Sequence, residues 1–185
     1  TVLSRGLGDV YKRQNEYIAK LNKSMNQHLE KLDWQPDIIL TSYHGLPRRY
    51  LDLGDPYHCH CHKTTRLLKE MNKKYSKKII LSFQSRFGRE EWLKPYTEET
   101  VIKLANDGIK KLAVLSPAFF SDCVETLEEL NIGIQEVFTE NGGEEFTLIP
   151  CLNDSQNGID LLDYLIKNEL QGCLLYTSPS PRDKT

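Results

Sequence analysis

Short apolar runs alternate with amphipathic segments along this chain, and this alternation constrains its fold more than any other feature. The runs are rich in Ile, Leu, Val and Phe, as is typical of buried strands. Strand–helix alternation predicts crossover units, and therefore an α/β fold with a parallel sheet and helices on both faces. The expected strands are 38–40, 78–83, 111–115 and 146–149, and the expected helices are 16–33, 56–71, 97–107, 122–139 and 159–170.

Residues that favour helix starts mark several of these boundaries. Asp55 followed by Pro56 predicts an N-cap and the first helical residue. Thr97 predicts a second N-cap. Asp122 and Glu125 fit a capping box, in which the first acid is the N-cap and the second lies three residues later. A functional role for the same two acids is compatible with capping, because a helix N-terminus is a common place for functional groups.

Size and charge exclude several classes of protein. A length of 185 residues suits one domain, or one half of a larger two-lobed protein. The formal net charge of -2 gives no basic stripe for nucleic acid, so no nucleic-acid partner is expected. No apolar stretch approaches the roughly 18 residues that span a bilayer, and no signal peptide opens the chain. Five cysteines without a short secreted framework favour a reducing, cytoplasmic location.

The two ends of the chain differ from the rest. Residues 1–14 show no helical or strand period, and residues 173–185 are rich in proline and polar side chains. Both stretches resemble translated adapter sequence that recurs at the ends of environmental gene fragments. We expect 1–14 and 173–185 to be non-native or disordered, which leaves 15–172 as the folded unit. Ordinary flexible termini are the alternative.

His44 follows the first expected strand and precedes a glycine. Ligands of open α/β sheets bind beyond the carboxyl ends of the strands. The loops after the next two strands share this edge, because successive parallel strands point the same way. Together the three loops predict a cleft for a large, flat, apolar ligand. They carry the aromatic residues Tyr43, Phe87, Trp92, Phe119 and Phe120 and the acids Asp122 and Glu125.

Each of these features also has a simpler interpretation. A single loop histidine is most often solvated, and the aromatic residues could form core. Glu125 and Glu129 lie one helical turn apart, as metal-binding carboxylates can, but surface acidic pairs are common. The run 58–62 alternates His and Cys and matches no standard zinc spacing. His58 and His62 would share a helix face and could bind metal adventitiously, but no biological metal site is expected there.

Taken together, the loops resemble ferrochelatase, the family of enzymes that insert iron in haem synthesis. The motifs that carry the resemblance occur in the family's order, over roughly residues 15 to 170. Only the C-terminal lobe of the family's two similar α/β lobes is represented. The motifs are Ser-Tyr-His-Gly-Leu-Pro at 42–47 with Gly-Asp-Pro-Tyr at 54–57, Ser-Phe-Gln-Ser-Arg-Phe-Gly at 82–88 with the Trp-Leu and Pro-Tyr-Thr of 92–97, Ser-Asp-Cys-Val-Glu-Thr-Leu-Glu-Glu-Leu at 121–130, and the final strand and loop at 146–154.

The resemblance implies a chelatase-like, Rossmann-like lobe of a lyase that inserts Fe(II) into a porphyrin, either protoporphyrin IX or coproporphyrin III. It places the catalytic and metal-contacting pair on His44 and Glu125. Imidazole has a pKa suited to accepting pyrrole protons, and both ligand types suit ferrous iron. Whether His44 acts mainly as base or as ligand is left open. The resemblance also implies a supporting acidic path at Asp122 and Glu129 and porphyrin contacts at Tyr43 and Trp92.

Departures from the family pattern limit these expectations. The N-terminal lobe should supply the opposite wall of the cleft, so the fragment is expected to be inactive alone. Cys173 is not followed by a cysteine cluster, so no iron–sulphur cluster is predicted, and no cofactor beyond substrate iron. The alternatives are a cobalt or nickel chelatase of the same fold, or a non-catalytic tetrapyrrole- or metal-binding module. Substrate identity, oligomeric state and peripheral membrane contact stay open.

Overall fold

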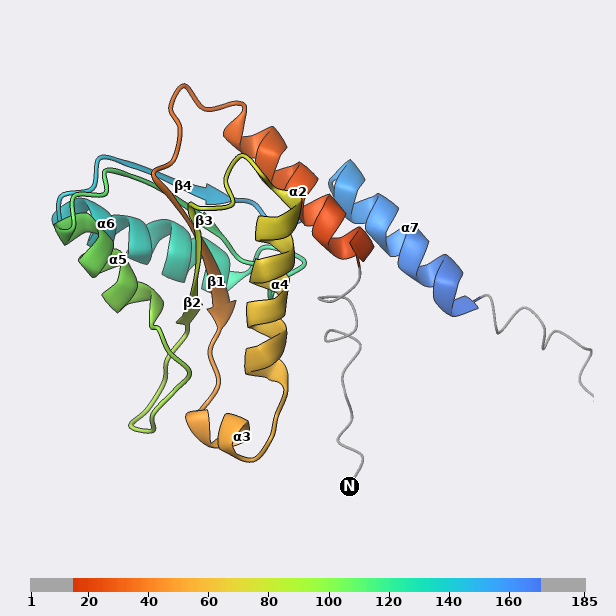
Figure 1. Cartoon of the computed structure of the whole chain (residues 1–185), viewed down its shortest axis with the longest axis horizontal. Helices are drawn as coiled ribbons and strands as arrows, with labels where there is room; N and C mark the ends of the chain where they lie inside the picture. The colour runs from red at the N-terminus through yellow and green to blue at the C-terminus, as the bar shows by residue number, and fades with distance from the viewer. Residues whose placement is uncertain (1–14, 171–185) are drawn as a thin grey trace, which may run out of the picture.

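The computed structural model describes residues 15–170, so the expectations for 1–14 and 173–185 lie outside the described residues. Within 15–170 the strands form one parallel sheet, in the order β2-β1-β3-β4 (Figure 1). The predicted α/β fold with a parallel sheet is therefore confirmed. The strands are β1 (Ile38–His44), β2 (Ile79–Gln84), β3 (Lys111–Leu115) and β4 (Glu145–Ile149).

Helices cover both faces of this sheet (Figure 1). The first layer contains α2 (Asn15–Leu29), α4 (Tyr57–Met71) and α7 (Gln156–Leu170). The second layer contains α5 (Thr97–Asn106), the π-helix η1 (Glu125–Ile134) and α6 (Gln135–Glu140), while the short α3 (Arg48–Asp52) lies beyond β1. None of the described helices is long and apolar enough to cross a membrane.

The two helical layers enclose two apolar cores. Because successive side chains of a strand point to opposite faces, Ile39 joins the core under α2, α4 and α7, whereas its neighbour Leu40 joins the core under α5, η1 and α6. Both side chains are fully buried. The sheet therefore provides a rigid platform on which the loops beyond its carboxyl edge are placed.

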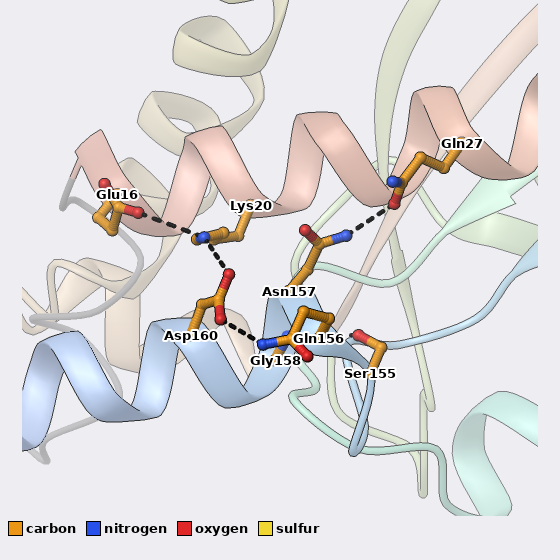
Figure 2. A network of polar contacts seen from close by, with 8 residues as sticks. All are labelled: Glu16, Lys20, Gln27, Ser155, Gln156, Asn157, Gly158 and Asp160. Carbon is orange, nitrogen blue, oxygen red and sulfur yellow. Dashed lines mark hydrogen bonds and ion pairs between the residues drawn. The ribbon is translucent and has the colours of Figure 1, made fainter.

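Polar contacts hold α7 against the entering helix α2, and Figure 2 shows this network. Lys20 of α2 lies 2.8 Å from an Asp160 carboxylate oxygen, and Gln156 donates to the other oxygen at 2.6 Å. Further along α2, the Asn157 amide donates to the Gln27 side-chain oxygen at 2.8 Å. These contacts join the first and the last helix of the described residues.

Several element boundaries differ from the expected ones. β1 continues to His44, because its pairing with β2 extends to the register pair His44–Gln84. Asp55 accepts a hydrogen bond from the Tyr57 backbone N–H at 2.8 Å, but Pro56 is the N-cap and α4 begins at Tyr57, one residue later than expected. Thr97 does not cap: it is the first residue of α5, and its hydroxyl bonds those of Ser42 and Ser82 instead. The short helix α3 was not expected.

Candidate functional site

His44 is the last residue of β1 and is half-buried at the carboxyl edge of the sheet. Its Nδ1 lies 2.7 Å from the Gly45 carbonyl oxygen. Because a carbonyl oxygen only accepts, Nδ1 carries the proton of the neutral ring and Nε2 carries the lone pair. The imidazole is therefore held in the tautomer whose Nε2 can take a proton or bind a metal.

Aromatic rings from two loops lie beside this imidazole. The ring of Trp92 is 6.4 Å from that of His44, and the ring of Phe119 is 6.3 Å from it on the β3 loop. The Trp92 indole N–H is buried and has no hydrogen-bond partner among the described residues. Of the other aromatic residues predicted around His44, Phe120 packs against the core under α2, α4 and α7, and Phe87 is exposed.

The loops after β1 and β2 are joined by backbone hydrogen bonds. Pro47 and Trp92 form an antiparallel bridge, and Leu93 N–H donates to the Leu46 carbonyl at 2.9 Å. Gly45 permits this close approach, since a Cβ there would lie 2.8 Å from the Gln84 carbonyl oxygen and 3.0 Å from the Trp92 ring. The absence of a side chain at position 45 therefore sets the distance between Trp92 and the end of β1.

Gln84 connects the ends of the strands to the π-helix. Its Oε1 accepts from the Ser42 hydroxyl at 2.7 Å, and its Nε2 donates to the Glu125 carbonyl oxygen at 3.0 Å. The same amide nitrogen lies 3.4 Å from a Glu129 carboxylate oxygen. Gln84 is buried, so these contacts are shielded from water. The sequence motif contained Gln84, but no sequence signal gave it this connecting role.

Glu129 is held by the turn that follows β2. Its carboxylate accepts from the Ser85 backbone N–H and from the Ser85 hydroxyl, both at 2.6 Å. Ser85 has a φ of 63°, a left-handed conformation that is uncommon for a non-glycine residue. Glu129 therefore shares a contact with Glu125, because the Gln84 amide reaches both residues. Its two carboxylate oxygens attach η1 to the edge of the sheet.

Glu125 is the first residue of the π-helix, which replaces the first half of the expected α-helix 122–139. π-helical turns are rare and often occur at functional sites. The pKa of Glu125 lies below its usual value, because the Cys123 side chain and the backbone N–H of Glu125 itself hydrogen-bond its carboxylate, with a smaller contribution from His44 in its protonated form. Gln84, the register partner of His44, donates to the Glu125 carbonyl oxygen, so Glu125 lies at the same edge of the sheet as His44, and their pairing stays a prediction.

Asp122 does not cap this helix, so the capping-box prediction is wrong. No side-chain hydrogen bond caps the start of η1. Instead, the Asp122 carboxylate accepts from Asn153 at 2.6 Å and from Thr126 at 3.1 Å. Burial raises the pKa of Asp122, but hydrogen bonds from Asn153, Cys151 and Thr126 outweigh it and leave the pKa below its usual value. Asp122 ties the start of η1 to the loop after β4.

Tyr43 does not line this site, which corrects the expected porphyrin contact. Its side chain is fully buried with Phe83 and Leu93. Its hydroxyl lies 2.8 Å from that of Thr65, inside the layer of α4. Because β1 extends through His44, consecutive side chains point to opposite faces. Tyr43 and His44 therefore cannot face the same cleft.

A hollow of about 380 Å³ lies between the end of β2, the start of α5 and η1. Glu129, Ser85 and Arg86 line it, together with Glu98 and Glu99, but neither His44 nor Glu125 does. Arg86 also forms an ion pair with Glu99 at 3.5 Å. This acidic hollow lies on the Glu129 side of the site and is separate from the aromatic surroundings of His44.

Comparison with known proteins decides the family. The ferrochelatase family model matches residues 8–170. The chain belongs to the ferrochelatase family. Curated ferrochelatases of Agrobacterium fabrum and Rhizobium etli are 54% and 51% identical to it over 156 and 162 residues. These alignments cover 84% and 88% of the chain, and the predicted resemblance is confirmed.

The chain spans about half the length of the curated ferrochelatases it matches, 45% of the Agrobacterium fabrum protein and 47% of the Rhizobium etli protein. Among solved structures, SirB from Bacillus subtilis with Fe3+ matches with a TM-score of 0.58. That match has 14% sequence identity and covers 84% of this chain and 54% of the SirB chain. It supports the fold alone, and agrees with the predicted chelatase-like lobe.

Proposed function

We propose that residues 15–172 are the C-terminal catalytic lobe of a ferrochelatase, which inserts Fe(II) into protoporphyrin IX or coproporphyrin III to form haem. Family membership supports the reaction. The observation that supports the assignment of the site is the imidazole of His44, held with Nδ1 on the Gly45 carbonyl at the strand edge that Gln84 connects to Glu125. Porphyrin and ferrous iron are the substrates in this proposal.

The chemistry requires a group that removes protons from the pyrrole nitrogens while iron enters. In this proposal, His44 Nε2 accepts one such proton or contacts the incoming iron, and both roles need the lone pair that its tautomer leaves free. The charged imidazolium that follows is stabilised by the neighbouring Glu125 carboxylate. Iron has to leave again with the product, so two weak contacts suit the task better than a closed cage.

The three acidic residues of the site have different roles in the proposal. Glu125 is partly exposed, and its lowered pKa keeps the carboxylate charged near neutral pH, as a metal or proton contact requires. Asp122 and Glu129 support it by fixing η1 at its start and its middle, through Asn153 and Ser85. Glu129 also lines the acidic hollow, through which we propose that cations or protons reach the site.

The aromatic side chains at the sheet edge suit a planar macrocycle. Trp92 and Phe119 flank His44 from two loops, and we propose Trp92 as a porphyrin contact. The other wall of the cleft would come from the N-terminal lobe, and the fragment alone would then be inactive. We propose a cytoplasmic location and no cofactor beyond substrate iron.

A restored two-lobed enzyme tests the proposal. The chain is joined to the N-terminal half of the Agrobacterium fabrum ferrochelatase, and zinc insertion is followed by porphyrin fluorescence. His44→Ala and Glu125→Gln should each lower turnover by roughly 100-fold or more, the range in which acid–base groups contribute. Glu128→Gln is the matched control, because Glu128 is exposed on the same helix, and it should leave turnover unchanged.

Unchanged turnover in His44→Ala or Glu125→Gln would show the site assignment to be wrong. Metal insertion by the unfused chain would refute the need for a second lobe. Anaerobic turnover with Fe(II), Co(II) and Ni(II) then tests the metal: iron should be preferred, and a clear preference for cobalt or nickel would favour a different chelatase.

A further inference from the structure

Two histidines that belong to no part of the proposed catalytic pair lie on the first two turns of α4. His58 and His62 are four residues apart, which places them on one face of the helix. Their Nε2 atoms form a hydrogen bond of 3.2 Å, and their ring centroids are 4.4 Å apart. Both line a surface hollow of about 370 Å³, together with Cys59, Lys63 and Arg66.

We propose that His58 and His62 form a second binding site, which chelates a divalent transition-metal cation such as Ni(II), Cu(II) or Zn(II). This site is independent of the proposed catalytic pair. Pairs of histidines at this spacing on a helix hold zinc in other metal proteins. Imidazole nitrogen is a ligand that zinc, copper and nickel share, whereas magnesium and calcium prefer oxygen.

The separation of the two nitrogens fits one shared cation. Zinc–imidazole bonds of 2.0–2.1 Å at a tetrahedral angle place two nitrogens about 3.3 Å apart. The distance of 3.2 Å between the two Nε2 atoms is close to this separation. The His58 ring is also stacked on Phe83 at 5.7 Å, which restricts one of the two ligands in advance. Little side-chain ordering would then accompany binding.

The contact between the two Nε2 atoms is a hydrogen bond, in which one ring donates its Nε2–H to the Nε2 lone pair of the other. Binding of a cation requires the donor ring to carry its hydrogen on Nδ1 instead, so that both Nε2 lone pairs face the cation.

The surroundings of the pair set the kind of cation and the strength of binding. Lys63 and Arg66 line the same hollow, and their charges oppose a cation that binds by electrostatics alone. Among the described residues, no group of three or more His, Cys, Asp or Glu side chains is arranged to hold a metal. The site therefore offers two protein ligands, with water completing the shell, and selects cations with high affinity for imidazole.

The start of α4 also contacts the proposed catalytic site. Tyr57, the residue before His58, donates from its hydroxyl to the His44 carbonyl oxygen at 2.8 Å. A cation shared by His58 and His62 would cross-link the first two turns of α4. Such binding should raise the thermal stability of the chain, because it favours only the folded state.

The test is a calorimetric titration of the full chain with Ni(II), in a His44→Ala background that disables the proposed catalytic pair. We expect one site that His62→Ala weakens at least about tenfold, since loss of an outer-shell partner alone costs about 10- to 100-fold in metal affinity. His58→Gln should weaken it similarly. Cys59→Ser is the matched control: it changes another side chain of the same hollow and should leave the affinity unchanged.

Thermal unfolding with and without Ni(II) provides a second readout. Ni(II) should raise the melting temperature of the His44→Ala chain but not of the chain that also carries His62→Ala, whose fold is checked by circular dichroism. His62 is exposed, so this substitution should leave the fold intact. An affinity that survives His62→Ala and His58→Gln, or one that falls in Cys59→Ser, would overturn the two-imidazole site.

Discussion

Gly45→Ala should destabilise the chain and displace Trp92. The added Cβ would lie 2.8 Å from the Gln84 carbonyl oxygen, which itself accepts the Gly45 N–H at 2.8 Å. That oxygen belongs to the backbone of β2, so it cannot rotate away as a flexible side chain would. The methyl group can be accommodated only if the loop moves away from β2 and from the Trp92 ring, 3.0 Å away.

The expected loss combines two terms. Overpacking a well-packed site costs about 1–3 kcal/mol, and weakening the Gly45–Gln84 hydrogen bond adds about 0.5–1.5 kcal/mol. We expect a loss of about 1.5–4.5 kcal/mol in the free energy of unfolding, or roughly 3–18 °C in melting temperature for a chain of this size. Urea unfolding measures the first quantity and calorimetry the second.

A matched substitution and a local probe separate this mechanism from general sensitivity. Gly133→Ala places its Cβ at an ordinary 3.6 Å from the Glu128 carbonyl oxygen. It should be neutral or stabilising by up to about 1 kcal/mol. In a Trp34→Phe background, the emission of Trp92 should shift in Gly45→Ala and not in Gly133→Ala. A loss below about 0.5 kcal/mol with unchanged emission in Gly45→Ala would refute the argument.

Two further predictions test residues around the site. Tyr43→Phe removes a buried hydroxyl contact to Thr65 and should lower the free energy of unfolding in urea by about 0.5–1.5 kcal/mol. The KM for porphyrin in the restored enzyme should stay unchanged, and a raised KM would show that Tyr43 contacts the substrate. The pKa of Asp122 is lowered in the fold, so its stabilising contribution is complete above the unfolded pKa of about 3.9 and is lost as pH falls through the lower folded value. Asp122→Asn should therefore make unfolding free energy fall less steeply between about pH 5 and pH 2, and parallel curves for the two proteins would contradict the shift.

Local signals predicted most of the fold. The apolar runs at 78–83 and 111–115 became β2 and β3 within one residue, and the helix expected at 56–71 begins one residue later, at Tyr57. These features depend on neighbours a few residues away, which the sequence displays directly. The π-helix was not predictable in this way, because acids and apolar residues at 125–134 fit an ordinary α-helix equally well.

The sequence by itself determined the parallel α/β fold, the family, and the position of His44 at a strand end, because periodicity and motif order are local properties of the chain. Tertiary structure decided how the site is built. Gln84 and Glu129 meet across more than 40 residues of chain, and only the pairing of β1 with β2 brings Trp92 to His44. The same pairing extends β1 through His44. Because side chains alternate between the two faces for as long as a strand continues, Tyr43 points to the face opposite His44.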